Sequence, residues 1–148
     1  MKNAKTLKKD ENGTTWMFSG DMGLMDEEGF VYFKQRIKRL IVTSGYNVYP
    51  THLENILDKH PAVDYSCVIG VKDSYKMKRI RAYIVLKEGY EANEETKQKI
   101  LEYCKVYLDV FEKPKEIIFK DELPKTLVGK VAYHSLEEEA EKEHQAQK

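Results

Sequence analysis

The sequence has no surplus of either charge and no long apolar run. Its 148 residues carry 25 basic and 25 acidic side chains, so the chain as a whole is not drawn to nucleic acid or to a membrane surface. No stretch approaches the ~20 apolar residues that a membrane-spanning helix needs. The lysine-rich start, MKNAKTLKKDENG, leads into no apolar segment, so it is not a secretory signal. We therefore expect one small soluble domain, or a small domain with part of another attached.

Cysteine is too scarce for a disulfide framework. Cys67 and Cys104 lie in the apolar phase of their segments, which predicts two buried thiols and a reducing cytoplasm and makes a disulfide the less favoured alternative. The histidines have no metal-ligand spacing with the cysteines (His52, His60, His134 and His144). We expect no metal site in the chain itself.

The first third of the chain predicts β-structure. Residues 1–13 are polar and predict a loop or frayed start, and residues 14–18 are β-prone. Residues 24–25 and 30–33 flank a DEEG turn, which predicts a hairpin closed by a left-handed glycine. Residues 40–42 predict a short buried strand broken by Ser44-Gly45. We interpret the whole stretch 35–50 as a hinge and a ligand-facing loop rather than part of a core.

The rest of the chain alternates helices and strands. Thr51 and Glu54 have the spacing of a capping box, and Asn93 is a plausible N-cap of a second helix. The elements predicted after residue 50 are, in order, a helix from 50 that ends at Pro61, a strand over 63–71 with one buried face, a polar connection over 72–78, a strand over 80–86 that is apolar on both faces, a helix from 93 to 108, a third strand over 116–119, a loop over 124–129 and an acidic helix or tail over 136–143. Few strands and short joins predict a small α+β fold: a short, mainly antiparallel three-stranded sheet flanked by helices and preceded by a β-hairpin.

Two short motifs combine a glycine turn with one charged residue. Asp21 follows Ser19-Gly20 at the end of a strand, where a carboxylate can accept two hydrogen bonds from a vicinal diol such as ribose. Gly129 permits an unusual turn immediately before Lys130, and a lysine on such a loop can be presented to another domain as a point charge for phosphate or carboxylate oxygens. The alternatives are an Asx-turn at Asp21 and an ordinary solvent-exposed lysine at 130. The second motif is not a phosphate-binding P-loop, because valine follows the lysine.

Taken in order, these motifs resemble those of the adenylate-forming enzymes, which include acyl-CoA synthetases, luciferases and the adenylation domains of peptide synthetases. SGD at 19–21 resembles the family's threonine-glycine-aspartate motif, with serine in place of threonine. GFVYFKQRIKRLIVTSGYNVYP at 29–50 resembles its hinge motif, although Gln35 stands where the family often has Gly or Asp, and LPKTLVGKV at 123–131 resembles its C-terminal lysine motif. The resemblance covers roughly residues 14–136 and is strongest to acyl-CoA synthetases of the fatty-acid–CoA ligase type.

The resemblance implies a role for individual residues. Asp21 would hold the ribose hydroxyls of ATP, and Arg36 would lie beside the same ribose or the phosphates. Lys38 would be the hinge about which the small domain swings. Gly45, with Tyr46 beside it, would line the tunnel for the pantetheine thiol of CoA. Lys130 would be the catalytic lysine of adenylation.

The resemblance also implies an enzyme with a second, larger domain. Residues 1–37 would be the tail end of that large N-terminal domain, and residues 38–148 the small C-terminal domain, with an acidic tail from about 137. The large domain would be this chain's partner and would carry the acyl pocket and most of the site for ATP and Mg²⁺, so this chain alone is expected to be inactive. The reaction would join a carboxylic acid, of the fatty acyl class, to AMP and then to CoA in the cytoplasm.

Several alternatives remain open. The basic cluster of Lys76, Lys78, Arg79 and Arg81 would meet the phosphates of CoA, or it is a solvated strand edge guarded by cations. The thiol acceptor would be CoA or a carrier protein. A nucleic-acid-binding module that uses Arg36, Lys38 and Arg39 together with this basic cluster is a different class of answer, but zero net charge and the absence of a stacking pair of aromatics argue against it. A last alternative is an interaction domain whose acidic segment, 137–143, docks a partner.

Overall fold

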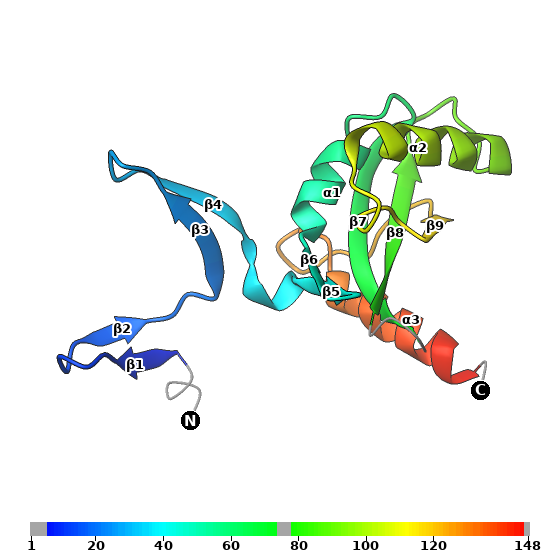
Figure 1. Cartoon of the computed structure of the whole chain (residues 1–148). Helices are drawn as coiled ribbons and strands as arrows, with labels where there is room; N and C mark the ends of the chain where they lie inside the picture. Colours follow the sequence, from blue (N-terminus) through cyan, green and yellow to red (C-terminus); the bar gives the residue numbers. More distant parts are fainter. Residues whose placement is uncertain (1–5, 74–77, 147–148) are drawn as a thin grey trace. The chain divides into compact units, whose positions relative to one another are not determined.

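The computed structural model describes residues 6–73 and 78–146, and the chain divides into two compact units, Met1–Arg39 and Leu40–Lys148 (Figure 1). None of the described helices is long and apolar enough to cross a membrane. Each unit is built around its own strands.

The first unit consists of two antiparallel hairpins. β1 (Leu7–Lys9) pairs with β2 (Thr15–Met17), and β3 (Asp21–Met25) pairs with β4 (Val31–Arg36). The hairpin around the DEEG turn is confirmed, with Gly29 in the left-handed region. The prediction of a loop over residues 1–13 is wrong for β1, because the Asp10 carboxylate accepts hydrogen bonds from the backbone N–H groups of Asn12 and Thr14 and so closes a turn that returns the chain.

The second unit has the predicted α+β fold. A short 3₁₀ helix, η2 (Ile37–Arg39), ends the first unit, and the second begins with a hairpin of β5 (Ile41–Thr43) and β6 (Tyr46–Val48). The remaining elements are α1 (Pro50–Leu57), β7 (Val63–Lys72), β8 (Lys78–Leu86), α2 (Glu94–Tyr107), β9 (Glu116–Phe119) and α3 (Tyr133–Ala146). The three-stranded sheet has the order β7-β8-β9, with β7 antiparallel and β9 parallel to β8. The predicted three-stranded, mainly antiparallel sheet is confirmed.

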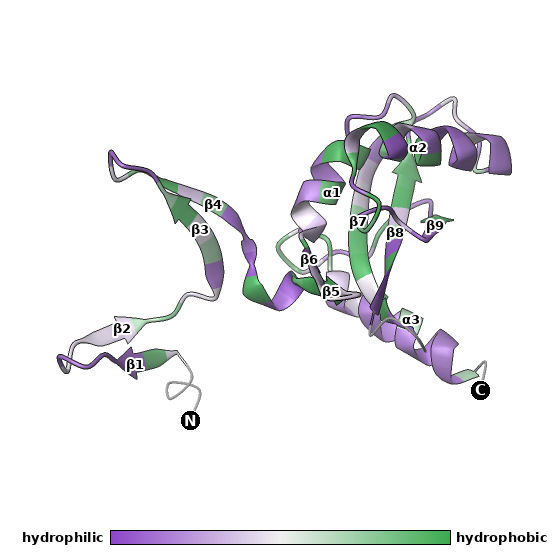
Figure 2. Ribbon diagram, viewed as in Figure 1, coloured by the Kyte–Doolittle hydropathy of each residue, from purple (hydrophilic) through white to green (hydrophobic). Residues whose placement is uncertain are grey.

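Helices cover both faces of this sheet, so it has a core on each side. α1 and α2 enclose one cluster of buried side chains, which includes Leu53, Val68 and Ile100. α3 encloses the other, which includes Tyr83 and Leu136. Figure 2 shows green apolar residues along both long strands and mostly polar residues over α3. The prediction that the 63–71 strand buries one face is therefore wrong, because the acidic segment predicted as a helix or tail is a helix that packs on the other face.

Two local predictions are corrected by long-range contacts. The capping box is wrong: Tyr49 is the N-cap of α1 and makes no side-chain cap bond, while the Glu54 carboxylate accepts a hydrogen bond from the backbone N–H of Val68 at 2.8 Å. The interpretation of 35–50 as lying outside any core is wrong for β5 and β6, because Ile41 and Val48 are buried members of the core that α1 and α2 enclose. The N-cap at Asn93 is confirmed, since its side chain accepts from the N–H of Thr96.

Candidate functional site

Asp21 and Arg36 lie directly opposite each other at the open end of the β3–β4 hairpin. The Arg36 Nε is 2.9 Å from the Asp21 Oδ1, and both side chains are partly exposed. Arg36 also donates through Nη1 to the carbonyl of Ser19, and the Ser19 hydroxyl accepts from the N–H of Asp21. The turn is therefore made by the serine rather than by an Asx-turn at Asp21. The guanidinium occupies one carboxylate oxygen, and a carboxylate has acceptor capacity for more than one donor.

Lys38 lies in η2, the three-residue helix at the end of the first unit. Its side chain is exposed, and the division between the two compact units follows one residue later, between Arg39 and Leu40. Lys38 therefore lies in a single short turn of helix between two strands, β4 and β5, and not in a long continuous element.

Lys130 closes a tight turn that spans Thr126 to Gly129. The backbone N–H of Thr126 donates to the Lys130 carbonyl at 2.7 Å, the N–H of Gly129 donates to the Thr126 carbonyl, and the Thr126 hydroxyl accepts from the Lys130 N–H. Gly129 has φ +78°, a conformation that an L side chain rarely adopts. Within the described residues, the Lys130 ammonium group has no hydrogen-bond or ion-pair partner, and the side chain is exposed. The turn thus fixes the backbone while leaving the charge available.

The β5–β6 turn borders a pocket of about 290 Å³. Ser44 and Gly45 have φ +50° and +83°, the two left-handed residues of a tight hairpin turn. Tyr46 stacks on Phe111 with ring centroids 4.4 Å apart and planes 13° apart. The pocket is lined by Thr43, Ser44, Tyr46, Arg79, Ile80, Val110, Phe111, Lys113 and Lys115. It therefore combines a flat aromatic wall with three cations.

The structure separates the predicted basic cluster. Arg79 reaches the pocket, but Lys78 lines a different cavity beside α3, and Lys76 lies outside the described residues. Arg81 is almost fully buried and paired, so it is not a solvent-facing cation. Sequence reasoning missed Lys113 and Lys115, whose signal was the KPK run before β9. They meet Arg79 because β9 runs parallel to β8, with the N–H of Lys115 donating to the carbonyl of Ile80.

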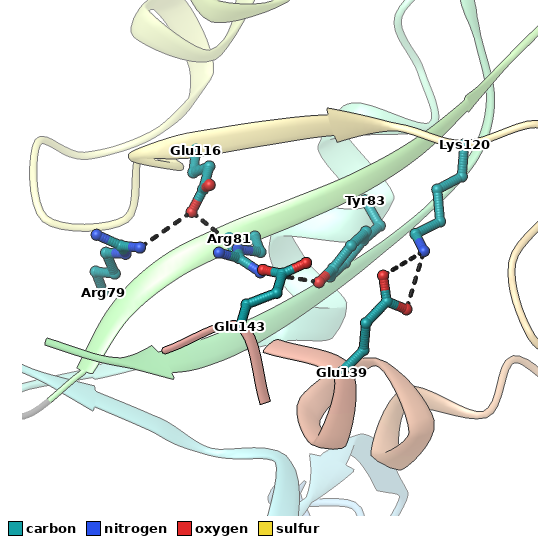
Figure 3. A network of polar contacts seen from close by, with 7 residues as sticks. All are labelled: Arg79, Arg81, Tyr83, Glu116, Lys120, Glu139 and Glu143. Atoms are coloured by element: carbon teal, nitrogen blue, oxygen red, sulfur yellow. Dashed lines mark hydrogen bonds and ion pairs between the residues drawn. The ribbon is translucent and has the colours of Figure 1, made fainter. Parts of the chain in front are cut away.

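Three glutamates of α3 pair with cations of the second unit. Lys120 contacts both oxygens of Glu139, at 2.6 and 2.9 Å, and Glu141 pairs with Lys72. The Oε2 of Glu143, on the same helix, lies 2.7 Å from the Arg81 Nη1, and Figure 3 shows the two side chains next to each other. The acidic segment that sequence reasoning offered as a docking surface for another protein is thus docked on its own sheet. Among the described residues, no group of three or more His, Cys, Asp or Glu side chains is arranged to hold a metal ion.

Residues 52–130, more than half of the chain, match the family described as the AMP-binding enzyme C-terminal domain. The chain belongs to this family. The match ends at Lys130, and it spans the sheet, the pocket cations and the tight turn described above.

Relatives within the family extend the likeness to most of the chain. The chain is 43% identical over 130 residues, 87% of its length, to a long-chain-fatty-acid–CoA ligase of Bacillus subtilis, and 42% identical over 116 residues, 78% of its length, to 4-hydroxybutyrate–CoA ligase 1 of Metallosphaera sedula. Its structure resembles that of ATP-bound MatB from Rhodopseudomonas palustris, with a TM-score of 0.79 and 33% identity over 93% of the chain. The chain spans only 23%, 21% and 26% of these three proteins.

Proposed function

We propose that this chain is the C-terminal part of an ATP-dependent acid–thiol ligase, with residues 38–148 as its mobile lobe. In the first half-reaction a carboxylate attacks the α-phosphorus of ATP, held as its magnesium complex, and pyrophosphate leaves. In the second half-reaction the thiol of CoA attacks the acyl-adenylate carbonyl and AMP leaves. The lobe supplies a cation to the first step and a channel wall to the second.

The observation that carries this proposal is the presentation of Lys130. Two anions must approach each other in the first half-reaction, so a cation placed between them stabilises the transition state more than the ground state. Lys130 has a backbone fixed by the turn, an exposed side chain and no partner among the described residues. Such a group is ready to be inserted into a site on another domain.

A rotation about Lys38 accounts for the use of both turns. The residue after the catalytic turn, Val131, packs with the core under α3, whereas Phe111, which stacks on Tyr46, packs with the core under α1 and α2. The two turns are therefore anchored to opposite faces of one sheet, and presenting each in turn to the same nucleotide requires the lobe to rotate. Short exposed segments between compact units are typical hinges.

The nucleotide end of CoA fits the pocket beside the β5–β6 turn. Arg79, Lys113 and Lys115 supply positive charge for phosphates, and the stacked Tyr46 and Phe111 offer a face to a purine. The ribose of ATP is assigned to Asp21, with Arg36 orienting the carboxylate and facing the phosphates. The relatives named as CoA ligases support CoA as the acceptor, and the ATP-bound MatB supports ATP.

Residues 1–37, which hold both hairpins of the first unit, are assigned to the end of a large N-terminal domain, with residues 38–148 as the lobe. Isolated two-stranded hairpins are marginal in water, and the described residues of this unit, 6–39, form two of them. More than half of each of its large apolar side chains Trp16, Phe18, Phe30 and Phe33 is exposed. A larger domain that pairs with these strands and covers these side chains would stabilise them.

Similarity to a relative supports the class of carboxylic acid that is the substrate, and the two buried thiols support the cytoplasm as the compartment. We assign a fatty acid as the substrate, because the Bacillus subtilis relative at 43% identity is named for long-chain fatty acids. Cys67 and Cys104 are both buried and unbonded, and they lie in the two cores on opposite faces of the sheet, so they are not placed to bridge. Two such thiols suit a reducing cytoplasm.

The test is a graft. The matching 130 residues of the Bacillus subtilis ligase are replaced by this chain, and two rates are measured: acyl-adenylate formation by pyrophosphate exchange, and thioester formation from supplied acyl-adenylate and CoA. The graft should restore both steps to a ligase that lacks these residues. Lys130→Ala should lower the first rate about 10²–10³-fold and leave the second unchanged, as expected for loss of one preorganised charge.

Lys125→Ala is the matched control, because Lys125 lies in the same loop but is paired with Glu122 at 2.7 Å. It should leave both rates unchanged. A folded graft that restores neither step refutes the proposed function. Equal loss of both steps in Lys130→Ala refutes the division of roles. If the graft forms a thioester with the pantetheine of a carrier protein but not with CoA, the acceptor is the carrier protein and not CoA.

A further inference from the structure

Arg81 lies at the centre of a polar network on the α3 face of the sheet (Figure 3). Its Nε donates to the Glu116 Oε2 at 2.8 Å, and its Nη1 donates to the Tyr83 hydroxyl at 3.1 Å and to the Glu143 Oε2 at 2.7 Å. Only 6% of its side chain is exposed. Burial alone would lower the pKa of Arg81, but the hydrogen bonds to Tyr83, Glu143 and Glu116 raise it, so the group is a permanent buried cation.

Glu116 is shared unequally between two arginines. The Arg79 Nη2 lies 3.4 Å from the same Glu116 Oε2 that Arg81 holds at 2.8 Å. Arg79 is on the same strand two residues earlier, is 39% exposed and lines the pocket assigned to CoA. Its Nε is buried and has no hydrogen-bond partner among the described residues. Arg79 is thus only loosely held by a carboxylate whose closer partner is Arg81.

This arrangement decides how much positive charge the pocket presents. A carboxylate closely paired with Arg79 would neutralise one of the three cations and repel an incoming phosphate. Because Arg81 binds the Glu116 carboxylate more closely than Arg79 does, the positive charge of Arg79 is less neutralised and can attract a phosphate in the pocket. We propose that Arg81 and Glu116 form a positioning pair that sets the affinity of the pocket for the phosphates of CoA by controlling whether Glu116 binds Arg79. The inference rests on the proposed function only in taking CoA as the pocket's ligand.

The proposal predicts effects of opposite sign for the two members of one ion pair. Glu116→Gln removes the competing carboxylate and should tighten binding. Arg81→Met releases Glu116 to pair closely with Arg79 and should weaken it. Each change should be about threefold to tenfold at low salt, the range for one charge near a partly exposed site. A purely structural role would weaken binding in both variants.

Glu143→Gln is the matched control. It removes the same kind of charged hydrogen bond from the other side of Arg81, but among the described residues Glu143 pairs with Arg81 and not with Arg79, the pocket cation that Glu116 also contacts. This variant should lose stability to a similar degree as Glu116→Gln and leave the affinity unchanged.

The experiment titrates the 148-residue chain with CoA and with adenosine 3′,5′-bisphosphate by calorimetry, and follows urea unfolding of each variant. Tighter binding in Glu116→Gln with unchanged binding in Glu143→Gln supports the proposal, and the two variants decide the matter even where Arg81→Met does not fold. Unchanged or weaker binding in Glu116→Gln overturns it. If the wild-type chain binds neither probe, the assignment of CoA to the pocket fails, and the inference fails with it; if the wild type binds, only the inference is at stake.

Discussion

Three glycines with a left-handed backbone can each be replaced by alanine to strain one turn, and the three turns have different proposed roles. Gly129, Gly45 and Gly89 have φ of +78°, +83° and +89°, and an added Cβ at each would meet no heavy atom within 4 Å. Substitution by alanine therefore costs backbone strain alone, about 1–2 kcal/mol for a left-handed L residue. All three variants should lose that amount of unfolding free energy, which urea unfolding measures, and should remain folded.

Their effects on the two half-reactions should differ. If the strain is relieved by opening the turn, the fraction of correctly formed turn falls by a factor of about 5 to 30, since 1.4 kcal/mol corresponds to tenfold. Gly129→Ala should lower acyl-adenylate formation by up to that factor, because the turn fixes the backbone of Lys130. Gly45→Ala should lower thioester formation instead.

Gly89→Ala is the control, since its loop has no proposed role. Both rates should equal those of the unsubstituted graft despite the same loss of stability. Equal losses of both rates in the Gly129 and Gly45 variants would refute the reasoning, because they would show that general destabilisation, and not the local turn, limits the reaction.

Three further predictions concern the hinge and the core. Lys38→Pro, which fixes φ at the pivot, should spare acyl-adenylate formation in the graft and abolish thioester formation; loss of the first step alone would contradict a hinge at this residue. Burial and then the charge of Lys87 lower the pKa of His60, whose Nδ1 accepts from the N–H of Ala62 at 3.1 Å, so the fold favours the neutral ring. The stability from His60 is therefore present above its ordinary pKa of about 6.5 and is lost as the pH falls through the lower folded value. His60→Asn should make the urea unfolding midpoint less dependent on pH between pH 7.5 and 5. An unchanged pH dependence of the midpoint would exclude His60 as its cause. Burial raises the pKa of the Cys104 thiol to about 11, so iodoacetamide at pH 8 should label it only at the rate of unfolding, and fast labelling of the native chain would contradict its burial.

The sequence predicted correctly those turns and that helix cap whose hydrogen bonds join residues a few positions apart. The DEEG hairpin depends on contacts within five residues, from Asp26 to Phe30, and Asn93 caps α2 through a residue three positions on. The turn before Lys130 is of the same kind, because Thr126 and Gly129 supply its bonds. Such features are readable from sequence because each donor meets an acceptor a few residues away.

Predictions failed where a residue's partner lies far along the chain. Glu54 has the capping-box spacing, but its carboxylate is used by Val68 of β7, while proline fills the first turn of α1. The stretch 136–143, predicted as an acidic helix or tail, is a helix that buries Leu136 and Ala140 in the core on that face of the sheet. Lys113 and Lys115 join Arg79 only through the parallel pairing of β9 with β8, which a short sequence window does not reveal.

The two turns are anchored to opposite faces of the sheet, which predicts that substitutions in them act independently on the two half-reactions. The Lys130 turn is held by its own backbone bonds and by the core under α3, and the β5–β6 turn by the stacking of Tyr46 on Phe111 on the other face. Sites that share no partner contribute additively. In the Gly45→Ala/Gly129→Ala double variant, the rate of each half-reaction should therefore fall by the same factor as in the corresponding single variant. The two rates are measured separately in the graft. A larger loss in either step would show that the turns communicate through the lobe, and the alternation between steps would then require internal rearrangement in addition to rotation about Lys38.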